Sequence, residues 1–163
     1  MPFHRLLVPL FLPLSLALLP STAQAQSDNH AADEVRAARL AQNRVLAIPL
    51  LDSAATYWTD DVVVVVSRGT VLRGKDQYRR AFAGDSVMVY VRSPATIDVA
   101  SAWPLAWEEG HWSGHLGAGG PAVIGGRYAA QWHRISGRWL IRSEVFVALT
   151  CSGDPCGWPI QSP

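Results

Sequence analysis

The alternation of hydrophobic and polar residues predicts helices in the first part of the chain and strands after them. Apolar positions recur at an intermittent helical spacing in three segments, which are residues 33–51, 50–58 and 75–83. Pro49 should break the first helix or start the second, because proline lacks the backbone N–H that a helix interior uses. Asp60 and Asp61 should end the second helix before the chain continues as a strand.

Strand patterns follow, beginning with five consecutive valines, Val62–Val66, that are typical of a buried strand. Further strands are expected over residues 87–91, with a continuation over 96–100 beyond Pro94, and over 103–112, 123–135 and 138–149. Ser136 and Gly137 predict a two-residue hairpin turn between the last two. Helices first and a meander afterwards predict an α+β domain in which helices cover one face of a curved antiparallel sheet.

Strict alternation in the last two strands divides their side chains into an apolar and a mixed face. The apolar face would hold Tyr128, Ala130, Trp132, Trp139, Ile141, Ser143, Val145 and Val147, and the mixed face Arg127, Ala129, Gln131, His133, Leu140, Arg142, Glu144 and Phe146. Two interpretations remain open. Either the apolar face is the core and the mixed face is wet, or the mixed face lines a pocket and the aromatic face meets a second copy of the sheet.

The first 25 residues predict a secretory leader. A basic start is followed by an apolar run over residues 6–19 and the small-x-small triplet Ala23-Gln24-Ala25. The run is too short for a membrane span of about 20 residues. We therefore expect an exported protein, periplasmic or secreted, with a flexible segment over residues 26–32, one domain over 33–150, and a tail over 151–163.

Composition and charge narrow the classes of function. The chain has 163 residues, of which 49% are hydrophobic and 17% charged, so it is not a disordered chain. Its formal charge is +1 and its basic residues are scattered, which argues against a nucleic-acid partner. Cys151 and Cys156 are the only cysteines, and in an oxidising compartment they should close a small disulfide ring.

Three segments resemble the nuclear transport factor two-like superfamily. They are Tyr57–Val66, with its Asp-Asp-strand corner, Gly74–Phe82, and Gly126–Trp139, with its Gly-Arg-Trp hairpin. The SnoaL-like, domain-of-unknown-function branch is most similar. The resemblance implies a cone-shaped roll, also described as cystatin-like, with an internal pocket and often a dimer through the sheet. The superfamily contains enzymes and noncatalytic binding or assembly domains, so the fold leaves the function open.

Comparison with ketosteroid isomerase argues against that reaction. The isomerase's base aspartate falls at Val66, its protonated aspartate near Ala129 and its tyrosine near Gln42, so none of the three acting groups is present. The same overlay implies that Phe82 faces a pocket lined by Arg127, Gln131, Arg142, Glu144 and Phe146.

Candidate chemistry centres on Glu144. It could act as a general base with Arg127 or His133 as its polar partner, or it could form a simple ion pair with Arg142. Adjacent strand residues face opposite ways, so only one of Glu108 and Glu109 can point inward. Trp58 and Trp107 could line the pocket, with Arg127 holding an anionic group.

Two other motifs are weak. Residues 69–76 match most of a phosphate-binding loop, but Asp76 stands where a hydroxyl should bind magnesium, so a turn before a helix is the better interpretation. His111 and His115, with Glu109, could share a strand face, yet no second ligand cluster supports them and no metal or cofactor is predicted.

The sequence therefore favours an exported pocket protein that binds a small, largely apolar or aromatic molecule. It leaves open whether the protein catalyses an isomerase, dehydratase or hydrolase-type reaction. The alternative is a noncatalytic homodimer assembled through the aromatic sheet face.

Overall fold

The computed structural model describes residues 22–48, 50–83, 88–153 and 156. The expected leader up to residue 21, Pro49 and most of the tail lie outside these residues. The elements in chain order are α1 (Thr22–Ala47), α2 (Leu51–Ala55), β1 (Trp58–Val65), β2 (Val71–Arg73), α3 (Lys75–Ala83), β3 (Met88–Val99), β4 (Leu105–Leu116), β5 (Ala122–Ile135) and β6 (Arg138–Cys151).

The helices agree with the sequence pattern at α3 and differ from it elsewhere. The third helix has the predicted bounds. The first begins earlier than expected, so residues 26–32 are helical rather than flexible, as their alanines and polar helix formers permit. The second ends at Ala55, and Asp60 and Asp61 lie within β1 instead of stopping a helix. Both aspartates are exposed and paired with basic residues, Lys75 and Arg142, which lets a strand hold them.

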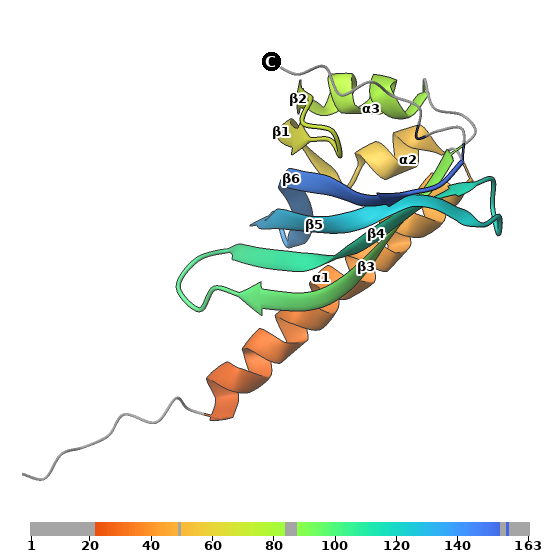
Figure 1. Ribbon diagram of the computed structural model, residues 1–163. Coiled ribbons are helices and arrows are strands. Elements are labelled where there is room, and N and C mark those ends of the chain that lie inside the picture. Colours follow the sequence, from red (N-terminus) through yellow and green to blue (C-terminus); the bar gives the residue numbers. More distant parts are fainter. Residues whose placement is uncertain (1–21, 49, 84–87, 154–155, 157–163) are drawn as a thin grey trace, which may run out of the picture.

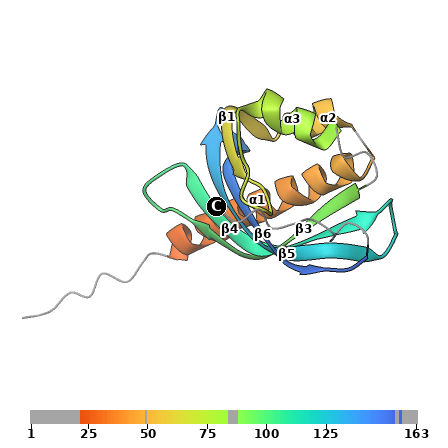
Figure 2. The same cartoon turned by 45° about the horizontal axis from the view of Figure 1, so that its top comes forward.

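The strands form one curved sheet in the order β2-β1-β6-β5-β4-β3. Every pair is antiparallel except β1 and β6, which run parallel. The α+β class and the cone shape are thus confirmed, with one parallel pair added. Figures 1 and 2 show the sheet bent around α1, with α2 and α3 closing the end beside β1.

The turn between β5 and β6 has the predicted hairpin geometry. Ser136 has a φ of 49° and Gly137 a φ of 77°. Two consecutive positive φ angles define the turn whose twist matches that of paired strands. The hairpin register follows from this turn, starting with Ile135 opposite Arg138.

β6 contains two extra residues, Arg142 and Leu149, and the first of them contacts β1. Ile141 and Ser143 lie opposite consecutive residues of β5, so Arg142 has no partner across the sheet there. Its guanidinium instead donates to the Asp61 carbonyl at 2.7 Å and pairs with the Asp61 carboxylate at 3.0 Å. An extra residue of this kind bends the strand and moves every later side chain to the other face.

This bulge exchanges the two predicted faces of β6 beyond Ile141. Glu144 and Phe146 lie opposite Ala130 and Tyr128 and point to the concave side, whereas Val145 and Val147 point outward. Before the bulge the prediction was correct, since the apolar residues of β5 and the start of β6 form the core. The aromatic face is therefore interior and does not meet another sheet.

Side chains of α1 bind the backbone of the edge strand β3. Asn43 donates to the carbonyl of Arg92 at 2.7 Å and accepts from its N–H at 3.1 Å. Arg36 donates to the carbonyl of Pro94 at 3.4 Å. A long edge strand otherwise presents unpaired backbone groups to other chains. The helix thus satisfies this edge and fixes the position of Arg92.

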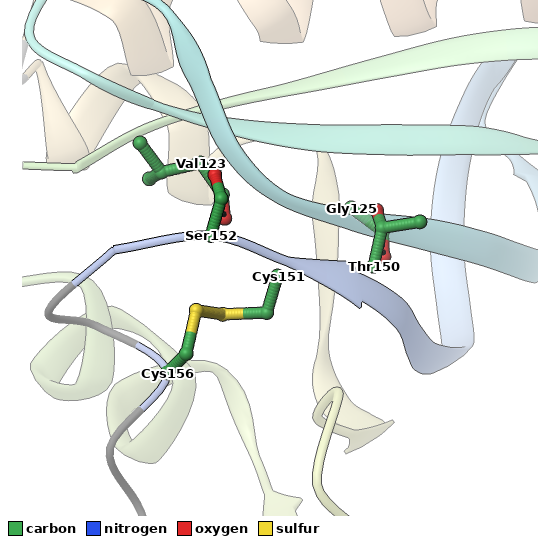
Figure 3. Close-up of a disulfide and its surroundings, with 6 residues drawn as sticks. All are labelled: Val123, Gly125, Thr150, Cys151, Ser152 and Cys156. Atoms are coloured by element: carbon green, nitrogen blue, oxygen red, sulfur yellow. Dashed lines mark hydrogen bonds between the residues drawn. A yellow bond between two sulfur atoms is a disulfide. The ribbon is translucent and has the colours of Figure 1, made fainter.

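The disulfide joins Cys151, at the end of β6, to Cys156, with their Cα atoms 5.7 Å apart (Figure 3). The backbone N–H of Ser152, between them, donates to the carbonyl of Val123 at 2.8 Å. A ring this short restricts the unfolded chain by roughly 2 kcal/mol in the entropic account. It fastens the start of the tail to the sheet.

Candidate functional site

The concave side of the sheet encloses a network of polar and charged residues. Its buried members come from α1, α3 and four strands, and they are Arg39, Gln42, Tyr78, Arg92, Glu108, Tyr128, Trp132 and Glu144. Buried charges cost several kcal/mol each unless they are paired and hydrogen-bonded. The contacts of each charge therefore decide what it can do.

Arg39 holds the two buried carboxylates together. Its Nε lies 3.0 Å and 3.2 Å from the two oxygens of Glu108, and its Nη2 lies 3.1 Å from Glu108 Oε2. Its Nη1 donates to Gln42 at 2.5 Å and forms an ion pair with Glu144 Oε1 at 2.9 Å. One guanidinium thus links α1 to β4 and β6.

Glu108 also accepts from two neighbours on β5. Trp132 Nε1 donates to Oε2 at 2.5 Å, and the Tyr128 hydroxyl donates to Oε1. Gly110 leaves room for the Tyr128 ring, because a Cβ at that position would lie 2.9 Å from the ring and 2.2 Å from a backbone oxygen. The sequence prediction that only one of Glu108 and Glu109 points inward is confirmed, and the inward residue is Glu108.

Glu144 connects the network to Arg92 through Tyr78. The Tyr78 hydroxyl donates to Glu144 Oε2 at 2.9 Å and accepts from Arg92 Nη2 at 3.2 Å. Both oxygens of Glu144 therefore face groups of the protein itself. The predicted ion pair of Glu144 with Arg142 does not form, because the bulge places the two on opposite sides.

The pKa values of Arg39 and of two tyrosine hydroxyls in this network are raised by their surroundings. Burial alone would lower the pKa of Arg39, but the charges of Glu108 and Glu144 outweigh it and raise that pKa. Burial raises the pKa of the Tyr78 hydroxyl, and the charge of Glu144 adds to this effect. Burial likewise raises the pKa of Tyr128, with Arg39 opposing and Glu108 reinforcing the shift. Both hydroxyls thus remain protonated donors at neutral pH.

Arg92 differs from Arg39 in having unused donors. It is 4% exposed, and its Nε and Nη1 have no hydrogen-bond partner within the described part of the protein. The rings of Phe82 and Phe146 lie 5.4 Å and 5.3 Å from the guanidinium carbon. Arg92 is therefore a buried cation with aromatic neighbours and free hydrogen-bonding capacity.

The structure brings together four of the predicted site residues. Trp58 is buried and Phe82 and Phe146 are half-buried on the concave side, together with Glu144. Trp58 contacts Tyr78 with ring centroids 4.4 Å apart. That these residues line a pocket, and that Glu144 has a catalytic role, stay predictions.

The other predicted site residues lie elsewhere. Arg127, Gln131 and His133 are on the outer face of β5, because they alternate with the buried Tyr128, Ala130 and Trp132. Trp107 is 43% exposed on the outer face of β4 and donates to Glu109 at 3.0 Å. Neither Arg127 nor His133 can therefore serve Glu144.

Sequence reasoning missed Arg39, Arg92 and Tyr78, and it did not decide between Glu108 and Glu109. A signal for Arg39 was present, because it falls on the same helical stripe as Val35 and Leu46, both of which are buried. Charged residues on an apolar stripe point to a buried pair. Arg92 gave no comparable signal, because its burial depends on the packing of α1 and α3 against β3.

The weaker motifs do not form sites. Lys75 Nζ lies 2.7 Å from Asp60, and its hydrogen bond and charge lower the pKa of that carboxyl. His111 is exposed, and His115 is hydrogen-bonded to Ser113 and to the Gly120 carbonyl. Among the residues with described placement, no group of three or more His, Cys, Asp or Glu side chains could hold a metal.

A sheet of this shape around a long helix, with polar and aromatic residues inside, defines the nuclear transport factor two-like fold. Solved structures match it along most of the chain. A nuclear transport factor two-like protein with a cystatin-like fold from Novosphingobium aromaticivorans has a TM-score of 0.64 at 12% identity, covering 86% of this chain and 92% of its own.

Two further structures give the same result. A ketosteroid isomerase-like protein from Erwinia carotovora atroseptica has a TM-score of 0.62 at 14% identity, with coverages of 75% and 98%. A nuclear transport factor two-like protein of unknown function from Shewanella oneidensis has a TM-score of 0.58 at 18% identity, with coverages of 69% and 95%. The predicted superfamily resemblance is confirmed at the level of the fold.

The sequence matches no protein-family model and no curated protein. The SnoaL-like branch stays a prediction. In the described part of the chain, no helix is both long enough and apolar enough to span a bilayer.

Replacing Arg39 with methionine should destabilise the protein strongly. Arg39→Met leaves Glu108 and Glu144 buried without their cation, at an expected cost of about 3–5 kcal/mol in the free energy of unfolding. Urea unfolding at neutral pH, followed by circular dichroism, measures it. The control is Arg44→Met on the exposed side of the same helix, which should change stability by about 0.5 kcal/mol or less.

Acidification should partly restore the variant. Without Arg39, burial favours the neutral carboxyls, so the folded variant binds protons more tightly than the unfolded one and gains stability as the pH falls. If Arg39→Met and Arg44→Met unfold at the same urea concentration, Arg39 does not have the central role assigned to it.

Proposed function

We propose that the protein is an exported binding protein that takes a small, largely apolar or aromatic molecule on the concave side of its sheet. The supporting observation is a continuous set of aromatic rings whose neighbouring centroids lie 4.4–6.1 Å apart. It comprises Trp58, Tyr78, Phe82, Tyr90, Trp112, Phe146 and Tyr128. Apolar walls with a few polar groups are typical of small-molecule sites.

The aromatic set changes in exposure along its length. Trp58 and Tyr78 are buried against the core, whereas Phe82, Tyr90 and Phe146 are half-buried. Solvent therefore reaches the last three rings. A ligand that covered them would remove apolar surface from water, which stabilises the complex by about 25 cal/mol per Å².

The proposal is binding rather than a particular reaction. A general base must reach the proton that it removes. Glu144 contacts Arg39 and Tyr78 through its two oxygens, and Glu108 is held by Arg39, Tyr128 and Trp132. These contacts give both carboxylates a structural role.

A neutral fluorescent probe tests the binding site. N-phenyl-1-naphthylamine should become more fluorescent when it binds the wild-type protein. Phe146→Ala should weaken its binding by about tenfold, because the substitution removes aromatic contact worth roughly 1–2 kcal/mol. A fluorescence titration gives both dissociation constants.

The control is Ile135→Ala, which shortens a 45% exposed aliphatic residue at the end of β5. It should bind the probe as the wild type does. Circular dichroism should show that both variants are folded. Equal affinities for all three proteins would mean that the probe does not use the concave side, and would contradict the proposal.

Export is the second part of the proposal and rests on the leader pattern of residues 1–25. Intact-mass analysis of the protein from the exported fraction of its own cells should give the mass of residues 26–163 with one disulfide. The full-length mass, found in the cytoplasm with reduced cysteines, would contradict it. A small molecule retained under native conditions would identify the ligand.

A homodimer is supported by a separate observation on the outer face. Val145, Val147 and Leu149 of β6 are 50%, 45% and 63% exposed. Exposed aliphatic side chains close together on a sheet mark interaction surfaces more often than isolated ones do. We place the dimer interface on this aliphatic stripe, in contrast to the aromatic face expected from the sequence.

Placing a charge on the aliphatic stripe should prevent dimerisation. Val147→Asp should be monomeric at concentrations where the wild type is dimeric, because pairing would bury an uncompensated carboxylate. Light scattering coupled to size-exclusion chromatography measures the mass. Ile48→Asp, which alters a 58% exposed residue after α1, is the control and should remain dimeric. A monomeric wild type at micromolar concentration would exclude the dimer.

A further inference from the structure

The buried cation Arg92 indicates which class of molecule this site takes. We infer that the ligand carries a carboxylate that accepts hydrogen bonds from the Arg92 guanidinium while its apolar body covers Phe82, Tyr90 and Phe146. The inference rests on the proposed binding function and adds the charge and chemical class of the ligand to it.

Arg92 has hydrogen-bond donors that no described residue accepts from. An arginine side chain has donors on all three of its nitrogens and no acceptor. Within the described residues only Nη2 of Arg92 has an acceptor, the Tyr78 hydroxyl at 3.2 Å, while Nε and Nη1 are buried without one. A buried donor without a partner costs about 1–3 kcal/mol, and more when it is charged. An oxygen-rich ligand would remove this cost.

The charges around Arg92 also favour an acidic ligand. Arg39 is paired with both buried carboxylates, whereas Arg92 forms no ion pair with any described residue. Its one hydrogen bond goes to a neutral hydroxyl, and that hydroxyl already donates to Glu144. The two arginines and two carboxylates of the network balance in charge, but no carboxylate of a described residue contacts Arg92 directly, and a ligand carboxylate would supply that contact.

The shape of the site around Arg92 suits a planar acidic group. Two rings lie near the guanidinium, those of Phe82 at 5.4 Å and Phe146 at 5.3 Å from its central carbon. Rings over a guanidinium use its faces and leave its edge for hydrogen bonds. Nε and Nη1 lie on different edges, so a planar carboxylate would bind one of them together with the second hydrogen of Nη2, in two parallel bonds.

The protein also fixes Arg92 in place. Asn43 holds both backbone groups of Arg92, and the Tyr78 hydroxyl holds one end of its side chain. A donor held in advance loses little conformational freedom when a ligand binds. Arg127, which the sequence suggested for an anionic group, lies on the outer face with a side chain that is 62% exposed.

Competition between two molecules of the same shape tests the inference. 2-Naphthoate and its neutral amide, 2-naphthamide, are each titrated against N-phenyl-1-naphthylamine bound to the full-length mature protein. With the wild type, naphthoate should displace the probe at a concentration at least about tenfold lower than naphthamide. This comparison requires no variant, so a folding defect cannot obscure it.

Variants then assign the preference to Arg92. Arg92→Gln should still bind the neutral probe but should lose the preference, with the two competitors equal within about twofold. Arg127→Gln, which removes an arginine from the outer face, is the matched control and should keep the full preference. Circular dichroism and the probe titration verify that each variant is folded.

The outcomes separate the inference from the proposed function. If the wild type does not bind the neutral probe, the proposed function itself fails. If it binds the probe but takes naphthamide as well as naphthoate, the proposed function stands and the carboxylate inference is wrong. The inference is also wrong if Arg127→Gln removes the preference and Arg92→Gln does not.

Discussion

The structure depends on one buried guanidinium. Arg39 contacts Glu108 on β4 and Glu144 on β6, so the long first helix is tied to two strands that are not adjacent in the sheet. Buried ion pairs often contribute little net stability compared with apolar residues, but removing one partner is costly. The pairing thus specifies how α1 lies across the concave face. The placement of Tyr78, Tyr128 and Trp132 follows from it, because each donates to one of the two carboxylates.

This network separates two kinds of buried charge. Arg39 lies 3.0 Å from Glu108 and 2.9 Å from Glu144, so these three charges contact one another. Arg92 lies at the other end of the hydrogen-bond chain, beyond Tyr78, where the aromatic rings are only half-buried. The protein therefore holds its paired charges in the core and an unpaired one beside partly exposed apolar surface. In small-molecule sites, a few polar groups beside an apolar wall fix the orientation of the ligand.

The sequence predicted most of the fold and about half of the site. The α3 bounds, the valine strand, the Ser136-Gly137 turn and the superfamily resemblance follow from local patterns, because local backbone preferences decide them. The division of β6 into two faces was wrong beyond Ile141, since the bulge at Arg142 depends on contacts with β1, including Asp61. Phe146 and Glu144 were nevertheless placed inside, because the overlay on the related fold implied it. The same overlay wrongly placed Arg127 inside, and His133 was misplaced with it, because alternation without the bulge puts both on one face with Glu144.

The bulge at Arg142 also determines which residues of β6 lie on each face of the sheet. Beyond Arg142, β6 alternates between residues that face the aromatic set and residues of the aliphatic stripe, with Phe146 between Val145 and Val147. A partner that covers the stripe restrains the backbone of the strand that carries Glu144 and Phe146. Since Phe146 lies against Arg92, the proposed assembly on the outer face and the proposed ligand binding on the concave face would act on one strand. Coupling between two sites requires an element that both can bias, and β6 is the element that these two faces share.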